Sequence, residues 1–260
     1  MNTVVRHEIV ILVRRGPAGA DAVFSFVAAR AMQLLEACAA AVTGAGMLCA
    51  WRLLSKLKAP DGVDPRELAG RWCSAVHAAT TGTMAVLAVA GAMDPRIGAI
   101  GMAVSIGYFV HDSVVVISLR TQPMVPILAH HVLCSGCMAA VLHSARPFIW
   151  YANLLQWTEC TIPIQFACWL MEIHAVDVAR PRAYALGRWL MTLAWVMLRL
   201  VLMVGFFYLS WRDWSSFSAI ARFSSAVIGP FLTAFNIGGF LMIILPGMPW
   251  WPPKVKGKQQ

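Results

Sequence analysis

Charged residues are scarce in this sequence. Lys, Arg, Asp and Glu make up 13% of the 260 residues and apolar residues 59%, whereas a soluble domain usually carries about 25% charged residues. A soluble chain of this length would leave much apolar surface in water, which favours aggregation. In a bilayer the same surface already lies in a matching solvent. The composition therefore excludes a soluble globular fold and predicts an integral membrane protein.

Features of several other protein classes are also missing. The seven cysteines are odd in number and lie in or beside apolar runs, which argues against a disulfide framework. No glycine-rich phosphate loop follows a strand, and neither a serine-hydrolase elbow nor paired carboxylates occur. His130, Cys134 and Cys137 share one helical face, but a structural zinc site needs a fourth ligand and loop-like spacing, so we expect no metal and no bound cofactor.

Basic residues outnumber acidic ones, 21 against 12. They do not gather in one patch, and most lie in short segments between apolar runs, where Lys and Arg set the topology of a membrane protein. Nucleic acid is therefore not an expected partner.

Seven apolar segments are long enough to cross the hydrocarbon core as helices, which takes about 20 residues each. The predicted spans are residues 22–51, 72–93, 97–119, 127–144, 148–173, 189–211 and 219–245. The fourth span is the shortest, which leaves open a tilted or partly re-entrant segment. Asp94-Pro95-Arg96 predicts a turn, and a basic loop is expected to carry Arg180, Arg182 and Arg188.

These segments predict an all-α, polytopic membrane protein with about seven transmembrane helices. We expect an N-terminal segment at 1–21, a first transmembrane helix with a basic loop at 22–69, a transmembrane domain at 70–245 and a basic tail at 246–260. The small residues Gly98, Gly101, Ser105 and Gly107 predict a helix-packing seam in the third span.

The chain ends in Lys256-Gly257-Lys258-Gln259-Gln260. This pattern looks like the K-x-K-x-x retrieval signal of endoplasmic reticulum membrane proteins, which a coat protein recognises. The alternative is a basic tail that lies on anionic headgroups. The segments on the same side of the membrane as the C-terminus carry more Lys and Arg than those on the opposite side, so we expect a cytosolic C-terminus. Together with the tail pattern, this predicts a protein of the endoplasmic reticulum membrane.

Several ionisable side chains lie inside the predicted spans, where their cost marks them as candidates for function. They are His77, His111, His130, His131, His143, Asp112 and Glu159. A carboxylate beside a histidine fixes its tautomer and raises its basicity, as in a general base. The alternative is a set of hydrogen bonds between helices. His130 and His131 differ by about 100° around a helix, so one can face a pocket while the other bonds a partner helix. Arg199 in the sixth span is a candidate partner of Asp112 or Glu159.

Four short motifs follow one another with spacing that resembles the TLC-domain family. They are Ser74-Ala75-Val76-His77-Ala78, Gly107-Tyr108-Phe109 with Asp112, His130-His131, and Glu159-Cys160-Thr161-Ile162-Pro163. The resemblance covers roughly residues 70–245 and is closest to small TLC-domain transmembrane proteins. It implies a multi-span protein of lipid metabolism or lipid composition.

The family also includes ceramide synthases, which transfer an acyl group from acyl-CoA to a sphingoid amine. The resemblance maps their catalytic histidine pair onto His130 and His131. Their motif continues with H-D-x-x-D, where this chain has Tyr151, Ala152 and Leu155. Because the aspartates are missing, the resemblance favours a protein that binds or regulates membrane lipids over an acyltransferase of ceramide-synthase type.

Three functional hypotheses follow. The first is lipid homeostasis, with a lipid-binding pocket formed by His77, Tyr108, His111, Thr161 and Pro163. The second is an acyltransferase with acyl-CoA as co-substrate, in which His130 or His131 acts as base or acyl acceptor and Asp112 or Glu159 orients it. The third is a lipid or small-molecule transporter. Expected partners are membrane lipids, a coat protein at the tail and a second copy of the chain in a homo-oligomer.

Overall fold

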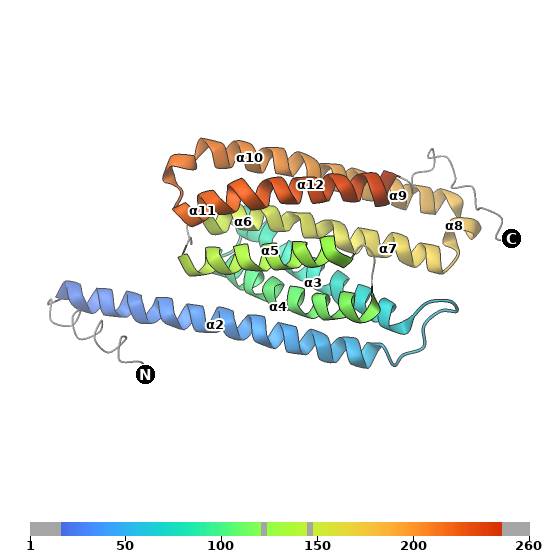
Figure 1. The fold of residues 1–260 in the computed structure, drawn as a ribbon, viewed down its shortest axis with the longest axis horizontal. Coiled ribbons are helices and arrows are strands. Elements are labelled where there is room, and N and C mark those ends of the chain that lie inside the picture. The colour runs from blue at the N-terminus through green and yellow to red at the C-terminus, as the bar shows by residue number, and fades with distance from the viewer. Residues whose placement is uncertain (1–16, 121–123, 145–147, 246–260) are drawn as a thin grey trace.

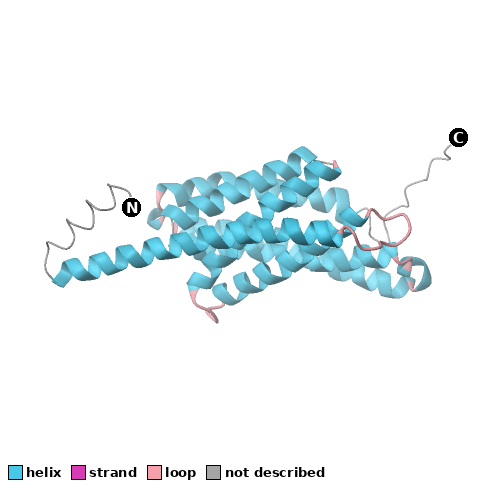
Figure 2. Cartoon of the chain, turned by 90° about the horizontal axis from the view of Figure 1, so that it is seen from below, coloured by secondary structure: helices cyan, strands magenta, loops and turns pink. Residues whose placement is uncertain are grey.

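The computed structural model describes residues 17–120, 124–144 and 148–245, which form helices and turns and no strand (Figure 2). The α-helices are α2 (Pro17–Leu54), α3 (Pro65–Val89), α4 (Pro95–Leu119), α5 (Met124–Ser144), α6 (Ile149–Gln156), α7 (Thr161–Ile173), α8 (Val176–Ala179), α9 (Pro181–Trp195), α10 (Leu202–Arg212), α11 (Ala219–Phe223) and α12 (Gly229–Gly239). Short 3₁₀-helices η2 (Trp157–Cys160) and η4 (Trp214–Ser216) and π-helices η3 (Val196–Val201), η5 (Ser224–Ile228) and η6 (Phe240–Ile244) join or extend them.

Six helices of the described chain are long and apolar enough to cross a membrane. The other predicted span, residues 148–173, is broken into α6, η2 and α7 and still runs along the bundle (Figure 1). The all-α membrane fold is therefore confirmed, and the number of seven crossings is approximate. The fourth span is one unbroken helix, α5.

Two helices begin one residue after an aspartate cap. Asp64 and Asp94 each accept a hydrogen bond from the backbone N–H two residues later, and a proline occupies the first turn. The Asp94-Pro95-Arg96 turn is thus also the start of α4, and α3 begins seven residues before the predicted second span.

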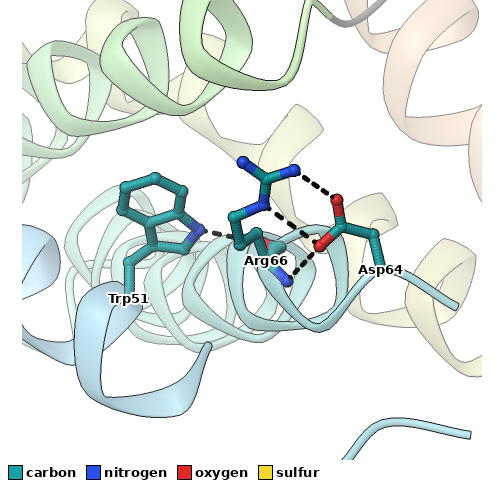
Figure 3. Close-up of polar contacts among 3 residues, drawn as sticks. All are labelled: Trp51, Asp64 and Arg66. Atoms are coloured by element: carbon teal, nitrogen blue, oxygen red, sulfur yellow. Dashed lines mark hydrogen bonds and ion pairs between the residues drawn. The ribbon is translucent and has the colours of Figure 1, made fainter. Parts of the chain in front are cut away.

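Figure 3 shows how the start of α3 is tied to the end of α2. The Arg66 guanidinium binds both carboxylate oxygens of Asp64, at 3.2 and 2.9 Å. The indole of Trp51 donates to the backbone oxygen of Arg66 at 2.9 Å. The hydrogen bonds from Arg66 hold the pKa of Asp64 below its ordinary value.

The predicted basic loop at residues 180–188 is wrong in its extent. Arg182 and Arg188 belong to α9, which begins at Pro181 because proline fits the first turn of a helix. Arg188 is buried and donates to the backbone oxygen of Ile244 at 3.1 Å. It also lies 3.7 Å from the carboxylate of Glu172. This arginine therefore fastens the end of η6 to α9, and only Arg180 remains between helices.

Small residues hold the third predicted span, α4, against its neighbours. A Cβ atom built at Gly107 would lie 2.0 Å from the backbone oxygen of Ala40 in α2, and one built at Gly44 would lie 3.1 Å from the backbone oxygen of Gly107. At Gly98 a Cβ would lie 2.4 Å from the Asn153 amide. The small-residue seam is therefore confirmed. It brings α2, at the edge of the bundle in Figure 1, into backbone contact with α4.

Candidate functional site

A polar cavity of about 230 Å³ lies inside the bundle. Its walls come from α3, α4, α5, η2, α7, η3 and α12, so no single segment of the chain forms it. The lining residues are Arg71, Ser74, Tyr108, Phe109, Asp112, Ile127, His130, His131, Glu159, Ile162, Gln165, Phe166, Arg199 and Phe235. Ionisable groups at this depth are costly unless they pair with each other or serve a ligand.

His131 is held by hydrogen bonds to the neighbouring helix. Its Nε2 atom lies 3.2 Å from a carboxylate oxygen of Asp112, and its Nδ1 atom lies 3.0 Å from the Ser113 hydroxyl. The Ser113 hydroxyl also donates to the backbone oxygen of Phe109 at 2.7 Å. Both ring nitrogens are therefore engaged, and the ring orientation is fixed from α4.

His130 leaves one ring nitrogen available. Its Nδ1 atom lies 3.5 Å from the Cys134 sulfur, one turn further along α5. Its ring stacks on Phe235 of α12, with centroids 4.6 Å apart. Within the described ranges Nε2 has no hydrogen-bond partner, and His130 lines the cavity. Of the two adjacent histidines, His130 is the one that can form a new hydrogen bond.

Arg199 supplies a fixed positive charge. It lies in the π-helix η3, a geometry that often marks functional positions. Its Nε donates to the Thr161 hydroxyl at 2.7 Å and one terminal nitrogen donates to the Asn236 side chain at 3.1 Å. The guanidinium also lies 4.5 Å from the centre of the Trp195 ring. These three contacts from three elements leave the guanidinium little freedom to move.

Glu159 is the least restrained carboxyl group of the site. It lines the cavity together with Arg199, and no hydrogen bond to it occurs within the described ranges. The hydrogen bonds of Arg199 go to Thr161 and Asn236 instead, so the sequence-based pairing of Arg199 with Asp112 or Glu159 is not a direct hydrogen bond. Glu159 therefore remains an acceptor for a ligand.

The five residues predicted for a lipid pocket have different places. Tyr108 lines the cavity and bonds the Ser74 hydroxyl at 2.6 Å. His77 is fully buried outside the lining, stacked 3.8 Å from the Tyr108 ring and bonded to Ser105 at 3.1 Å. Thr161 reaches the site only through Arg199.

The other two also lie outside the cavity lining. His111 is fully buried, and neither ring nitrogen has a partner in the described chain. Pro163 lies in the first turn of α7, outside the cavity lining. All four residues predicted as catalytic candidates thus line the cavity, whereas of the five predicted for the lipid pocket only Tyr108 does, and His77 and Thr161 contact lining residues.

The cavity continues toward one end of the bundle. A second hollow of about 390 Å³ shares Arg71, Ser74, Asp112 and Ile127 with it. This hollow extends to Asp64 before α3 and to Leu119 at the end of α4. Polar groups are therefore continuous from the histidines to the end of the bundle where α3 begins.

The family model of the TLC domain matches residues 69–251, more than half of the chain. The chain belongs to the TLC-domain family. The match includes every lining residue of the polar cavity and leaves out α2, which packs on the family domain through α4. No curated protein and no solved structure gives a match.

Sequence reasoning overlooked several residues of this TLC-domain site. Arg71 and Gln165 line the cavity, and Ser113 holds His131. Arg71 precedes the predicted second span, although it lies in α3 and binds Glu67 at 2.8 Å. Asn236 was overlooked as well, and Arg199 is the signal that could have pointed to it, because an arginine within a span requires a polar partner. No set of three metal-binding side chains occurs in the described residues.

Proposed function

We propose that this TLC-domain protein binds the polar headgroup of a membrane lipid in the cavity and thereby regulates lipid composition. The observation that carries the proposal is a cavity within the bundle whose polar atoms are partly unpaired. Nε2 of His130 and the Glu159 carboxyl group are available, and Arg199 is fixed beside them. These three groups favour a headgroup that carries hydrogen-bond donors for Glu159 and a negatively charged or acceptor group for Arg199.

The energetics in a membrane support this assignment. A lipid chain gains little by moving from the bilayer into an apolar cavity, because both surroundings are apolar. Selectivity must therefore come from hydrogen bonds and charge in the headgroup site. Charge-assisted hydrogen bonds contribute about 1.5–3 kcal/mol each, so two to three of them suffice for selective retention of one lipid class.

The residues at the ceramide-synthase motif positions argue for binding without acyl transfer. Ala152 and Leu155 line an apolar cavity next to His130 and Glu159. Tyr151 points elsewhere, since its hydroxyl donates to the Asp213 carboxylate. The two motif positions beside the histidines are therefore apolar, and they offer neither a proton acceptor nor a charge.

The test is lipid mass spectrometry of cells that lack the protein. They are rescued with wild type, His130→Ala or His143→Ala at matched membrane levels. His143 is exposed near the end of the same helix and serves as the control. We expect wild type and the control to restore the lipid profile and His130→Ala to fail. Full rescue by His130→Ala would refute the proposal.

An acyltransferase is the second candidate. One observation favours it: His130 lines the cavity with Nε2 available to take a proton, and it adjoins His131, which lies 3.2 Å from Asp112. The hollow also opens at the end of the bundle for which the charge bias predicts a cytosolic location, where acyl-CoA is present. Acyl transfer from acyl-CoA to a long-chain amine by purified wild type, lost in His130→Ala, would favour this candidate.

The location is part of the proposal. We place the C-terminus in the cytosol, supported by the charge bias of the segments between spans. We place the protein in the endoplasmic reticulum because the tail resembles a retrieval signal. Lys256 and Lys258, on which the retrieval signal depends, lie outside the described residues. Replacing both lysines with serine should release the protein to later compartments if a coat protein reads the tail.

A further inference from the structure

An apolar groove of about 410 Å³ runs along the outside of the bundle between α5 and the α11–η5 segment. Its walls are Val132, Leu133, Gly136, Cys137, Ala140, Ala219, Ile220, Phe223, Ser224 and Ile228. Val132 and Phe223 are exposed on this surface, 70% and 65%, and both belong to predicted membrane spans. The groove therefore faces the lipid chains of the bilayer.

This groove connects to the inside of the bundle. Cys137, Ser224 and Ile228 also line an internal apolar cavity of about 50 Å³. That cavity in turn shares Phe109, His130 and Glu159 with the polar cavity. Three adjacent hollows, each sharing wall residues with the next, thus lie between the polar site and the lipid-facing surface.

The local sequence explains why the helix that contains η5 is distorted beside the groove. Pro230 has no backbone N–H and cannot bond the residue four positions earlier, which disturbs the helix in the preceding turn. That turn is the π-helix η5, Ser224–Ile228, whose Ser224 and Ile228 face both the groove and the internal cavity. On the opposite wall Gly136 contributes no side chain, so the groove stays wide.

We propose that this groove is a lateral port that holds the acyl chain of the lipid whose headgroup occupies the polar cavity. The inference rests on the proposed headgroup site. The internal cavity has room for only a few water molecules or a short piece of chain. A bound lipid must therefore lead its chain out of the bundle, and the groove continues the same apolar surface to the bilayer.

An acyl chain fits the groove better than a partner helix does. A helix packed on this surface would cover the groove from outside without using its continuity with the interior. The end of the path at His130 and Glu159 is polar, and its walls between there and the surface are mostly apolar. This order of polarity matches a single lipid molecule from headgroup to tail.

Two glycine variants test the port. A Cβ atom at Gly136 meets no atom within 4 Å, so Gly136→Leu fills the groove without a clash at the backbone. Gly205 in α10 is equally free of neighbours and lies outside the groove lining, so Gly205→Leu is the matched control. Both proteins are purified as full chains in lipid nanodiscs, and their thermal unfolding is compared first to establish equal folding.

The probes are two photoreactive phospholipids, one with a diazirine next to the headgroup and one with a diazirine in the middle of an acyl chain. Cross-linked peptides are mapped by mass spectrometry. We expect the headgroup probe to label cavity peptides and the chain probe to label groove peptides in wild type and Gly205→Leu. In Gly136→Leu the groove labelling should be lost, and labelling of the cavity should fall with it.

The outcomes separate the port from the headgroup site. Cavity labelling that persists in Gly136→Leu at the wild-type level would overturn the port and leave the proposed function standing. Absence of cavity labelling in wild type would overturn the proposed function and the port together. Groove labelling that is equal in Gly136→Leu and wild type would show that the chain lies on the surface without entering, and the port would again be refuted.

Discussion

Replacing Gly107 with alanine should weaken the attachment of α2 to the TLC domain. The new Cβ would lie 2.0 Å from the backbone oxygen of Ala40 and 2.9 Å from the backbone nitrogen of Gly44. Since carbon and oxygen atoms normally approach no closer than about 3.3 Å, α2 would have to retreat by about 1 Å. Neither contact can be relieved by a side-chain rotation, because both involve backbone atoms.

The expected loss follows from two opposing effects. Overpacking of this kind costs about 1–3 kcal/mol, occasionally more. Replacing a helical glycine with alanine returns up to about 1 kcal/mol. Because the obstruction is backbone on α2, we expect a net loss of about 1–2 kcal/mol in the free energy of unfolding. That corresponds to a decrease in Tm of about 2–8 °C for a chain of this size.

Two further variants make the prediction quantitative. A Cβ at Gly44 lies 3.1 Å from the backbone oxygen of Gly107, so Gly44→Ala should cost less than Gly107→Ala. Gly46 in the same helix has no atom within 4 Å, so Gly46→Ala should leave Tm unchanged or raise it. The assay is thermal unfolding of detergent-purified protein followed by tryptophan fluorescence. Any other order of the three Tm values would refute the packing argument.

Three other perturbations follow from the contacts. Asp112→Asn and His131→Ala should each lower Tm, with a coupling energy of about 0.5–3 kcal/mol in the double variant, whereas additive losses would contradict a direct pair. Arg199→Lys should cost about 1–3 kcal/mol, because an ammonium group lacks the planar fork that serves its two partners. A Tm equal to wild type would refute this. Hydrogen bonds from Arg212 and Tyr151 lower the pKa of Asp213 from 3.8 to about 2. This stabilisation is therefore present above about pH 4 and lost toward pH 2, so the Tm difference between wild type and Asp213→Asn should shrink over that range and not stay constant.

The positions of the helices were largely predictable from the sequence. In a bilayer each backbone polar group must be satisfied within its own segment, so an apolar run of sufficient length has to be a helix. Helix ends were less predictable, because Asp64 with Pro65 and Arg180 with Pro181 read equally well as loops and as helix starts. The break of residues 148–173 into α6, η2 and α7 was missed, although Gln156, Thr158 and Glu159 lower the hydropathy at the place where the helix breaks.

The site was predictable in composition but not in geometry. The motif spacing and the cost of ionisable groups in lipid single out His130, His131, Asp112 and Glu159, and these four line one cavity. Their individual partners could not be derived, since Ser113 and Arg199 enter the site from helices whose relative rotation no local pattern encodes.

The sequence by itself determined that this chain is a helical membrane protein of the TLC-domain family, because apolar length and motif order are properties of the chain alone. Only the tertiary structure decided which polar groups meet. Helix rotation and separation are set by contacts between distant residues, such as Gly107 against Ala40. In that arrangement both nitrogens of His131 are bonded to α4, His130 faces the cavity, and one internal apolar hollow lies between that cavity and the lipid-facing groove.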